Sequence, residues 1–192
     1  MKKRALFLDR DGVINVDFGY VHTPDNFEFI EGIFELVLAA NRAGYLVIIV
    51  TNQAGISRGY YTIDTFNDLT EWMKNQFAEK GAQIDEVYFC PHHPEMGFNE
   101  YQRHCDCRKP APGMIRKAEL EHSIDLENSL LIGDSPSDIQ SAEAAGIKTA
   151  ILIGECDDAL IESSYLILPN LNSALEYFLT EFNLQKGQRL PK

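Results

Sequence analysis

Short apolar runs alternate with amphipathic segments of helical period along nearly the whole chain, and this alternation limits the possible folds most strongly. An apolar run of roughly four to eight residues, bounded by turn residues, is typical of a strand buried on both faces. Such strands alternating with helices build a parallel sheet covered by helices, so we expect an α/β fold. The expected strands are residues 5–8, 45–50, 84–89, 129–132, 147–153 and 165–168, and the expected helices are 33–43, 63–80, 113–122, 136–145 and 172–182.

The length of 192 residues is sufficient for one complete hydrophobic core, because domains usually have about 100 to 200 residues. We expect a single domain, residues 1–184, followed by a polar tail, residues 185–192, that has no visible reason to be ordered. The irregular stretches 13–31 and 91–111 are longer than ordinary connections of about 4 to 6 residues, so functional loops are expected there.

Acidic residues outnumber basic ones by 29 to 17, which gives a formal net charge of −12. This charge repels nucleic acid and anionic membranes. A small phosphorylated metabolite is still a suitable partner, because salt screens charges beyond about 8 Å. Whether such an anion binds therefore depends on the charged groups at the site itself. The sequence has no apolar run of the roughly 18 to 20 residues that a membrane span needs, and no signal-peptide pattern at its start. We expect a cytoplasmic protein without nucleic-acid or membrane partners.

Two aspartates, Asp9 and Asp11, follow the first expected strand. Because strand side chains alternate, we expect both to face one side while Arg10 points away. Carboxylates held this close need a proton or a divalent cation between them, which favours Mg²⁺. Asp134 ends another expected strand, and ligand sites in parallel sheets lie at the carboxyl ends of strands. Asp9 and Asp134 should therefore meet if their strands are neighbours.

Further polar residues follow the same rule. Thr51 and Asn52 end a third apolar strand, and Lys109 follows the second irregular loop. Each motif alone has an ordinary explanation, since Asp-x-Asp-Gly is a common turn and Gly-Asp before proline is a common strand exit. Their fixed order makes chance a poor explanation. Asp138 has two interpretations of equal weight, a partner of the site or an acid in the first turn of a helix.

Together these motifs resemble the four motifs of the haloacid-dehalogenase-like phosphatase superfamily. The matching stretches are Asp9-Arg10-Asp11-Gly12, Thr51-Asn52-Gln53, Lys109 and Gly133-Asp134. The resemblance implies a Rossmann-like sheet of order 3-2-1-4-5 without a large cap domain. It also implies that Asp9 is the nucleophile that forms an aspartyl-phosphate, and that Asp11 is the general acid and then the base. By the same resemblance, Mg²⁺ rests on Asp9, the Asp11 backbone carbonyl and Asp134, while Thr51 and Lys109 face the phosphoryl oxygens, where transition-state charge develops.

Three of the four cysteines lie beside a histidine in the second irregular stretch. The pattern is Cys-x-His, twelve residues, and then Cys-x-Cys, formed by Cys90, His92, Cys105 and Cys107. Such a set fills all four positions of tetrahedral zinc, so we expect a structural Zn²⁺ that holds the loop 90–107 and positions Arg108 and Lys109. Alternative ligands are His93 and His104, and buried free cysteines are the alternative to a metal site. Cys156 lies far away and is interpreted as a small buried or loop residue.

Several stretches also resemble a zinc-loop subgroup of this superfamily, which includes heptose bisphosphate phosphatases and histidinol-phosphate phosphatases. The stretches are 17–22, 51–56, 58–59, 71–73 and 90–94, and they are more similar to the heptose enzymes. This resemblance implies removal of the 7-phosphate of D-glycero-D-manno-heptose 1,7-bisphosphate during ADP- or GDP-heptose and lipopolysaccharide biosynthesis, by a monomeric enzyme. The expected substrate-binding residues are Asp17, Phe18, Gly19, Tyr20, Asn52, Gln53, Ala54, Arg58, Arg108 and Ser135.

Arg58 and Arg108 are expected to meet the distal phosphate, a role that suits the bidentate guanidinium fork. Two departures from the family pattern bear on substrate choice. Val13 stands where many members have threonine, and Ser135 stands where the heptose enzymes often have lysine. The alternative functions are a histidinol-phosphate phosphatase, a non-enzymatic phosphoacceptor module, a zinc-stabilised binding module and a nucleic-acid 3′-phosphatase. The last of these needs a basic track that an acidic chain does not display.

Overall fold

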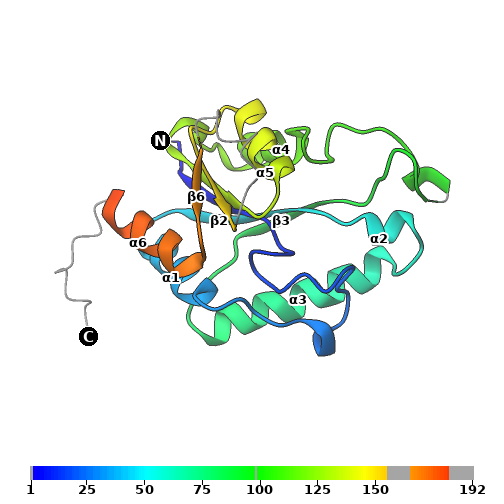
Figure 1. Cartoon of the computed structure of the whole chain (residues 1–192), viewed down its shortest axis with the longest axis horizontal. Coiled ribbons are helices and arrows are strands. Elements are labelled where there is room, and N and C mark those ends of the chain that lie inside the picture. The colour runs from blue at the N-terminus through cyan, green and yellow to red at the C-terminus, as the bar shows by residue number, and fades with distance from the viewer. Residues whose placement is uncertain (1, 98, 155–164, 182–192) are drawn as a thin grey trace.

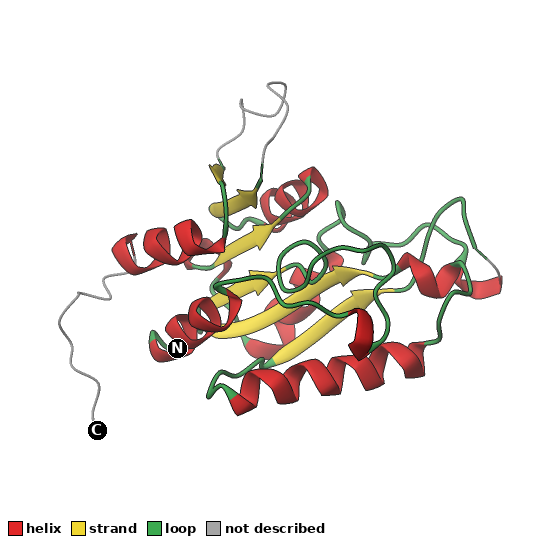
Figure 2. Ribbon diagram, turned by 60° about the horizontal axis from the view of Figure 1, so that its bottom comes forward, coloured by secondary structure: helices red, strands yellow, loops and turns green. Residues whose placement is uncertain are grey.

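A computed structural model describes residues 2–97, 99–154 and 165–181 and contains one parallel six-stranded sheet (Figures 1 and 2). The spatial order is β3-β2-β1-β4-β5-β6, so the predicted order 3-2-1-4-5 is confirmed and a sixth strand extends it beyond β5. The strands are β1 (Ala5–Leu8), β2 (Leu46–Asn52), β3 (Glu86–Cys90), β4 (Leu130–Gly133), β5 (Thr149–Ile153) and β6 (Leu166–Leu168).

Helices cover both faces of the sheet, as Figure 1 shows. One layer holds α1, α3 and α6, and the other holds α4 and α5. The helices are α1 (Ile33–Arg42), α2 (Ala54–Ser57), α3 (Ile63–Glu79), α4 (Gly113–His122), α5 (Pro136–Ala145) and α6 (Leu171–Glu181), and the 3₁₀ turns are Pro24–Asn26, Asn99–Tyr101 and Leu126–Asn128.

Successive side chains of each strand point to opposite faces of the sheet, so the hydrophobic core has two parts. In β1, Leu6 and Leu8 belong to the cluster under α1, α3 and α6, whereas Ala5 and Phe7 belong to the cluster under α4 and α5. All four side chains are fully buried. This explains the unbroken apolar runs, because a strand with helices on both faces has no polar side. Trp72 is half-buried and packs against the first cluster.

The expected boundaries agree closely with the observed ones. The bounds of β1, α4 and α5 coincide with the prediction, and α3 begins where Thr62 accepts a hydrogen bond from the Thr65 backbone N–H. The sequence prediction omitted α2, because four residues are too few to show a helical period. The division into one domain and a polar tail stays a prediction, since residues 182–192 lie outside the described ranges. The interpretation of Cys156 also stays a prediction, because this residue lies outside them as well.

Parallel topology brings the ends of β1, β2 and β4 to one edge of the sheet. β1 lies between β2 and β4, with Leu8 paired to Ile49 and Ile132. The residues that follow these strands are therefore neighbours, as predicted for Asp9 and Asp134. No helix in the described part of the chain has the length and apolar character needed to cross a membrane.

Candidate active site

A cavity of about 470 Å³ opens where the carboxyl ends of β1, β2 and β4 meet. Most of the residues singled out from the sequence line it. The lining consists of Asp9, Asp11, Asp17, Gly19, Tyr20, Thr51, Asn52, Gln53, Ala54, Arg58, Tyr61, His93, Arg108, Lys109, Asp134, Ser135 and Ser137. Among the predicted catalytic and substrate-binding residues, only Phe18 is absent from the lining, and this residue is 61% exposed.

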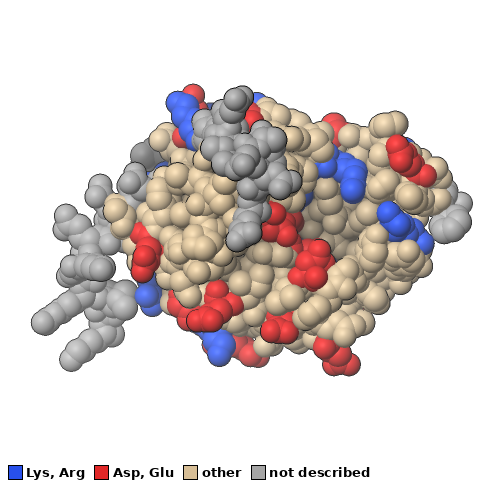
Figure 3. Space-filling view, in the orientation of Figure 1, with Lys and Arg blue, Asp and Glu red and all other residues tan. Residues whose placement is uncertain are grey.

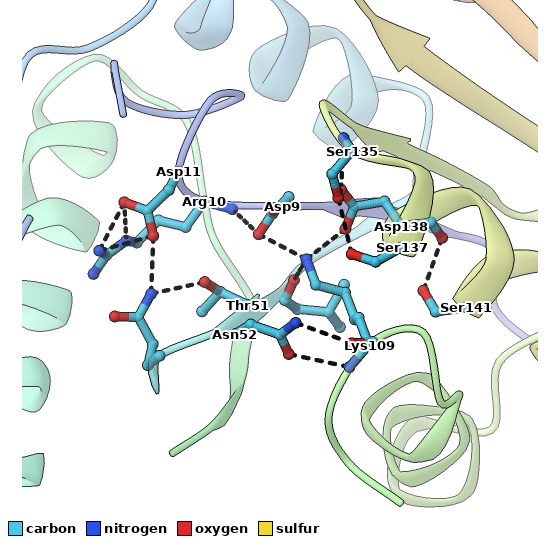
Figure 4. Close-up of polar contacts among 12 residues, drawn as sticks. Asp9, Arg10, Asp11, Thr51, Asn52, Lys109, Ser135, Ser137, Asp138 and Ser141 are labelled. Carbon is cyan, nitrogen blue, oxygen red and sulfur yellow. Dashed lines mark hydrogen bonds and ion pairs between the residues drawn. The ribbon is translucent and has the colours of Figure 1, made fainter. Parts of the chain in front are cut away.

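Lys109 joins two carboxylates at the floor of this cavity (Figure 4). Its Nζ lies 2.8 Å from Asp9 Oδ1 and 2.5 Å from Asp138 Oδ1, and it donates to the Val50 carbonyl at 2.9 Å. The ammonium thus has three oxygen atoms within 2.9 Å. The contact of Lys109 with the phosphoryl oxygens stays a prediction, and in the structure its charge lies directly beside Asp9.

The protonation of these groups reflects their burial. Burial raises the pKa of Asp9 to about 7 although Lys109 lowers it, and burial together with the charge of Asp138 raises the pKa of Asp134 to about 6. Burial lowers the pKa of Lys109, but Asp9 and Asp138 outweigh that effect and raise it overall. The two buried carboxylates of Asp9 and Asp138 and the more exposed carboxylate of Asp134 outnumber the one buried cation, and such an environment favours a bound metal ion.

The carboxylates have the geometry of a hard-cation site. Single oxygens of Asp9, Asp134 and Asp138 all lie within 4.8 Å of one another. Gly12 leaves room for Asp134, since a Cβ at Gly12 would lie 1.8 Å from Asp134 Oδ2. An all-oxygen, all-anionic donor set fits Mg²⁺. The side chain of Asp11 lies outside this group, and the expected contact through its backbone carbonyl stays a prediction.

Asp138 fulfils both interpretations that the sequence left open. Its Oδ1 pairs with Lys109, and its Oδ2 accepts hydrogen bonds from the backbone N–H and the hydroxyl of Ser135 at 3.1 and 2.7 Å. The residue therefore caps the start of α5 and also contacts the site. Gly133 permits this approach, because a Cβ there would lie 2.2 Å from Asp138 Cβ.

The expectation that Arg10 points away from Asp11 is wrong. Arg10 is buried, and its Nη2 donates to Asp11 Oδ1 at 2.8 Å and to Oδ2 at 3.0 Å. Strand alternation does not extend this far, because β1 ends at Leu8 and the chain turns at Gly12, where φ is +84°. Asn15 donates to Asp11 Oδ1 at 3.1 Å. The donors around Asp11 therefore fix the position of its carboxyl group.

The end of β2 supplies three side chains with separate tasks. Asn52 holds the backbone of Lys109, accepting from its N–H at 3.0 Å and donating to its carbonyl at 3.2 Å (Figure 4). Gln53 donates to Thr51 Oγ1 at 2.8 Å and to Asp11 Oδ2 at 3.0 Å. Because Thr51 accepts there, its own hydroxyl hydrogen is directed elsewhere and is available to the cavity.

Basic and donor groups gather at another part of the cavity wall. Arg58 has a buried Nε without a hydrogen-bond partner among the described residues. Arg108 donates to the His92 carbonyl at 3.2 Å, which ties it to the cysteine-rich loop. His93 accepts at Nδ1 from the backbone N–H groups of residues 95 and 96, so its Nε2 carries the hydrogen. Burial and the two arginines lower the pKa of His93.

Three lining residues were not among the predicted catalytic, substrate-binding or magnesium-binding residues: Tyr61, His93 and Ser137. The sequence considered His93 only as an alternative metal ligand, but its Nδ1 is occupied by backbone donors. Ser137 is two residues beyond the predicted Ser135, on the first turn of α5. Tyr61 had no local signal, because it lies beyond α2 and reaches the cavity only through the fold.

The cysteines and histidine of the long loop form a compact cluster. The Sγ atoms of Cys90, Cys105 and Cys107 lie 3.2 to 3.5 Å apart, and His92 Nδ1 lies 3.3 Å from Cys107 Sγ. Within the described residues, His104 is not part of this cluster. Four ligand atoms at these separations surround one tetrahedral position, which is compatible with a zinc loop. The loop leads directly into Arg108 and Lys109.

The parallel sheet and the Asp9 cavity at its carboxyl edge define a haloacid-dehalogenase-like hydrolase. A family model described as HAD-hydrolase-like matches residues 106–173. Proteins of Vibrio cholerae and Burkholderia mallei are 52% and 54% identical to the chain over 80% and 85% of its length, which is 82% and 87% of theirs. The first is the D-glycero-β-D-manno-heptose-1,7-bisphosphate 7-phosphatase, and the second is the corresponding α enzyme.

A crystal structure agrees with these relatives. The D,D-heptose 1,7-bisphosphate phosphatase of B. bronchiseptica, complexed with magnesium and phosphate, superimposes with a TM-score of 0.79. It is 30% identical, and the match covers 93% of this chain and 99% of that one. The chain belongs to the family of D-glycero-D-manno-heptose-1,7-bisphosphate 7-phosphatases, and it is a phosphoric monoester hydrolase.

Proposed function

We propose that the chain removes the 7-phosphate of D-glycero-D-manno-heptose 1,7-bisphosphate through an aspartyl-phosphate on Asp9. The observation that carries this proposal is the position of Asp9, which lies beside Lys109 in a cavity that also holds Arg58 and Arg108. One end of the cavity thus suits a reacting phosphate and another suits a second anionic group. The relatives' names supply the sugar.

In the proposed reaction, an oxygen of Asp9 attacks phosphorus while the bond from phosphorus to the sugar oxygen breaks. Asp11 delivers a proton to the departing sugar oxygen and later takes a proton from the water that attacks the aspartyl-phosphate. Inorganic phosphate leaves, and both aspartates return to their starting state. The Thr51 hydroxyl, which is available to the cavity, donates to the phosphoryl oxygens.

Two metal ions belong to this proposal. Mg²⁺ would be held by Asp9, Asp134 and the Asp11 backbone carbonyl, with Asp138 close by, and it supplies positive charge for the phosphoryl group. Zn²⁺ would be held by the four residues of the loop cluster, with no open position for substrate. Its role is structural, and it fixes the loop that carries Arg108 and Lys109.

The remaining cavity residues suit the rest of the substrate. Arg58 and Arg108 bind the 1-phosphate, and the hydrogen on His93 Nε2 is a further donor. The loop residues Asp17, Gly19 and Tyr20 and the start of α2 line the space for the sugar. The pair of guanidinium groups disfavours histidinol phosphate, the alternative substrate, because that substrate carries a cationic amine.

The proposed setting follows from the substrate and the charge. We propose a cytoplasmic monomer in nucleotide-heptose biosynthesis that binds neither nucleic acid nor membranes. On the face shown in Figure 3, the basic groups of the described residues are scattered and form no continuous track of the kind that nucleic acid would need.

A substrate panel tests the proposal. Phosphate release is measured from both anomers of the heptose 1,7-bisphosphate, from histidinol phosphate and from an aryl phosphate, with and without Mg²⁺, using Asp9→Asn as the blank. The proposal predicts Mg²⁺-dependent release that favours a heptose bisphosphate and falls by at least about a thousandfold in the variant. Preference for histidinol phosphate would contradict the substrate, and turnover by Asp9→Asn would contradict the mechanism.

A further inference from the structure

The hydroxyl of Tyr61 lies at the end of a buried chain of hydrogen bonds that leads to Asp11. Tyr61 donates to Gln53 Oε1 at 2.5 Å, and Gln53 Nε2 donates to Asp11 Oδ2 at 3.0 Å and to Thr51 Oγ1 at 2.8 Å. The Gln53 side chain is 1% exposed.

The direction of the Gln53 amide matters, because its two ends have opposite hydrogen-bonding character. The Asp11 carboxylate, when ionised, only accepts hydrogen bonds, so the NH₂ group must face it. A reversed amide would place a carbonyl oxygen against a carboxylate and leave the Tyr61 hydroxyl beside an NH₂ group. In the observed orientation the Tyr61 hydroxyl donates to the carbonyl end of the amide, which holds the NH₂ end against Asp11 and Thr51.

Packing contacts hold the Tyr61 ring in place, so its hydroxyl stays directed at Gln53. Its ring stacks on His22 with centroids 5.0 Å apart and planes 10° apart. It also packs over Gly55, where a Cβ would lie 2.2 Å from Tyr61 Cε1. Burial raises the pKa of the phenol to about 12, so the hydroxyl keeps its hydrogen at working pH.

We infer that Tyr61 is a positioning residue that acts through Gln53, fixing the amide that holds the Asp11 carboxylate and the Thr51 hydroxyl in place. The inference rests on the proposed function, in which Asp11 transfers protons and Thr51 contacts the phosphoryl group. Tyr61 also lines the cavity, so direct contact with substrate is the competing role. A purely structural role in packing is the other.

A double-mutant cycle separates these roles. Tyr61→Phe removes only the hydroxyl, and Gln53→Met removes the amide while keeping a chain of similar length. Because a hydrogen bond contributes about 0.5 to 1.5 kcal/mol, Tyr61→Phe should lower kcat by about threefold to tenfold. It should leave KM within about twofold. In the Gln53→Met background the same change should have almost no further effect, because no amide remains to orient.

The matched control is Tyr88→Phe. Tyr88 is also a buried tyrosine with a bonded hydroxyl, which donates to Glu121 at 2.6 Å, away from the cavity. Tyr88→Phe should leave kcat unchanged, and thermal unfolding shows whether either variant is destabilised. An independent readout is the NMR signal of the Gln53 side-chain NH₂. Its protons should be protected from exchange in the wild type and lose protection in Tyr61→Phe.

Each outcome decides the inference. A raised KM with unchanged kcat, or an equal loss of kcat in both backgrounds, would assign Tyr61 to substrate binding and overturn it. Unchanged kcat with unchanged amide protection would also overturn it. Failure of the proposed function has a different signature, namely a wild type that releases no phosphate or an Asp9→Asn variant that stays active. In that case, if the Gln53 side-chain NH₂ protons of Tyr61→Phe were as protected from exchange as those of the wild type, the proposed effect of Tyr61 on Gln53 would still be contradicted.

Discussion

Lys109 and Asp138 form an ion pair of 2.5 Å in which both side chains are shielded from solvent. Asp138 comes from the first turn of α5, whereas Lys109 comes from the loop before α4. The pair therefore ties the start of α5 to the loop before α4. It also gives the buried Lys109 a second anion, so that Asp9 is not its sole partner.

We expect Asp138→Asn to destabilise the fold, because it leaves the amide of residue 138 against the buried Lys109 ammonium. Loss of a buried ion-pair partner costs about 3 to 5 kcal/mol of unfolding free energy. Urea denaturation measures the change. The control is Asp125→Asn, a change at an exposed hydrogen bond to Asn128 that should cost no more than about 0.5 kcal/mol. Equal stability of the two variants would contradict the structural importance of the pair.

Gly12→Ala should weaken magnesium binding as well as stability. Gly12 and Gly44 share a left-handed backbone, with φ of +84° and +76°, but a Cβ at Gly44 meets no atom within 4 Å. At both sites the backbone strain costs about 1 kcal/mol. Only at Gly12 does the methyl group displace the Asp134 carboxylate. We expect the Mg²⁺ concentration for half-maximal activity to rise in Gly12→Ala and to stay constant in Gly44→Ala, and an equal response would contradict the role of Gly12.

Stabilisation by Mg²⁺ should increase with pH. Asp9 and Asp134 have pKa values raised to about 7 and about 6, from an ordinary 3.8 that also applies to the unfolded chain. Between these values the folded, metal-free protein binds more protons than the unfolded chain, so its stability falls as the pH rises. Mg²⁺ competes with those protons. The rise in melting temperature on adding Mg²⁺ should be larger at about pH 8 than at about pH 5.5.

The control for this measurement is Asp134→Asn, which removes one of the carboxylates. Its melting temperature should respond little to Mg²⁺ at either pH. An Mg²⁺ response of the wild type that is independent of pH would show that the ion binds elsewhere.

Cys107→Ser should remove zinc and activity together. Zinc sites of this kind contribute folding energy, and Cys107 precedes Arg108 and Lys109 directly. We expect about one zinc ion per wild-type chain by elemental analysis, and a loss of zinc, thermal stability and turnover in the variant. His104→Ala, at an exposed residue outside the cluster, should retain all three. Full activity of zinc-free Cys107→Ser would show that the loop does not depend on the metal.

The sheet was predictable because each central strand is buried on both faces. Apolar runs such as residues 5–8 leave little choice other than a covered parallel strand, and helix ends at Thr62 and Gly146 have local signals. The helix α2 was not predicted, because four residues are too few to show a helical period of apolar side chains and its conformation depends on packing at the end of β2.

The positions of site residues at the strand ends could be predicted from the sequence. The hydrogen-bond partners of individual side chains were harder to predict. Asp9 and Asp134 follow strands and Thr51 lies in the last two residues of one, so the three were expected to meet. The pairing of Arg10 with Asp11 depends on the turn at Gly12, and strand alternation predicted the opposite direction. The contribution of Tyr61 depends on a fold that brings it over Gly55.

The most direct test of the central claim is ³¹P NMR of the reaction with D-glycero-D-manno-heptose 1,7-bisphosphate and Mg²⁺. The account predicts that the 7-phosphate signal is replaced by inorganic phosphate while the 1-phosphate signal persists, and that Asp9→Asn leaves both signals unchanged. Loss of the 1-phosphate signal, or equal turnover by Asp9→Asn, would contradict it.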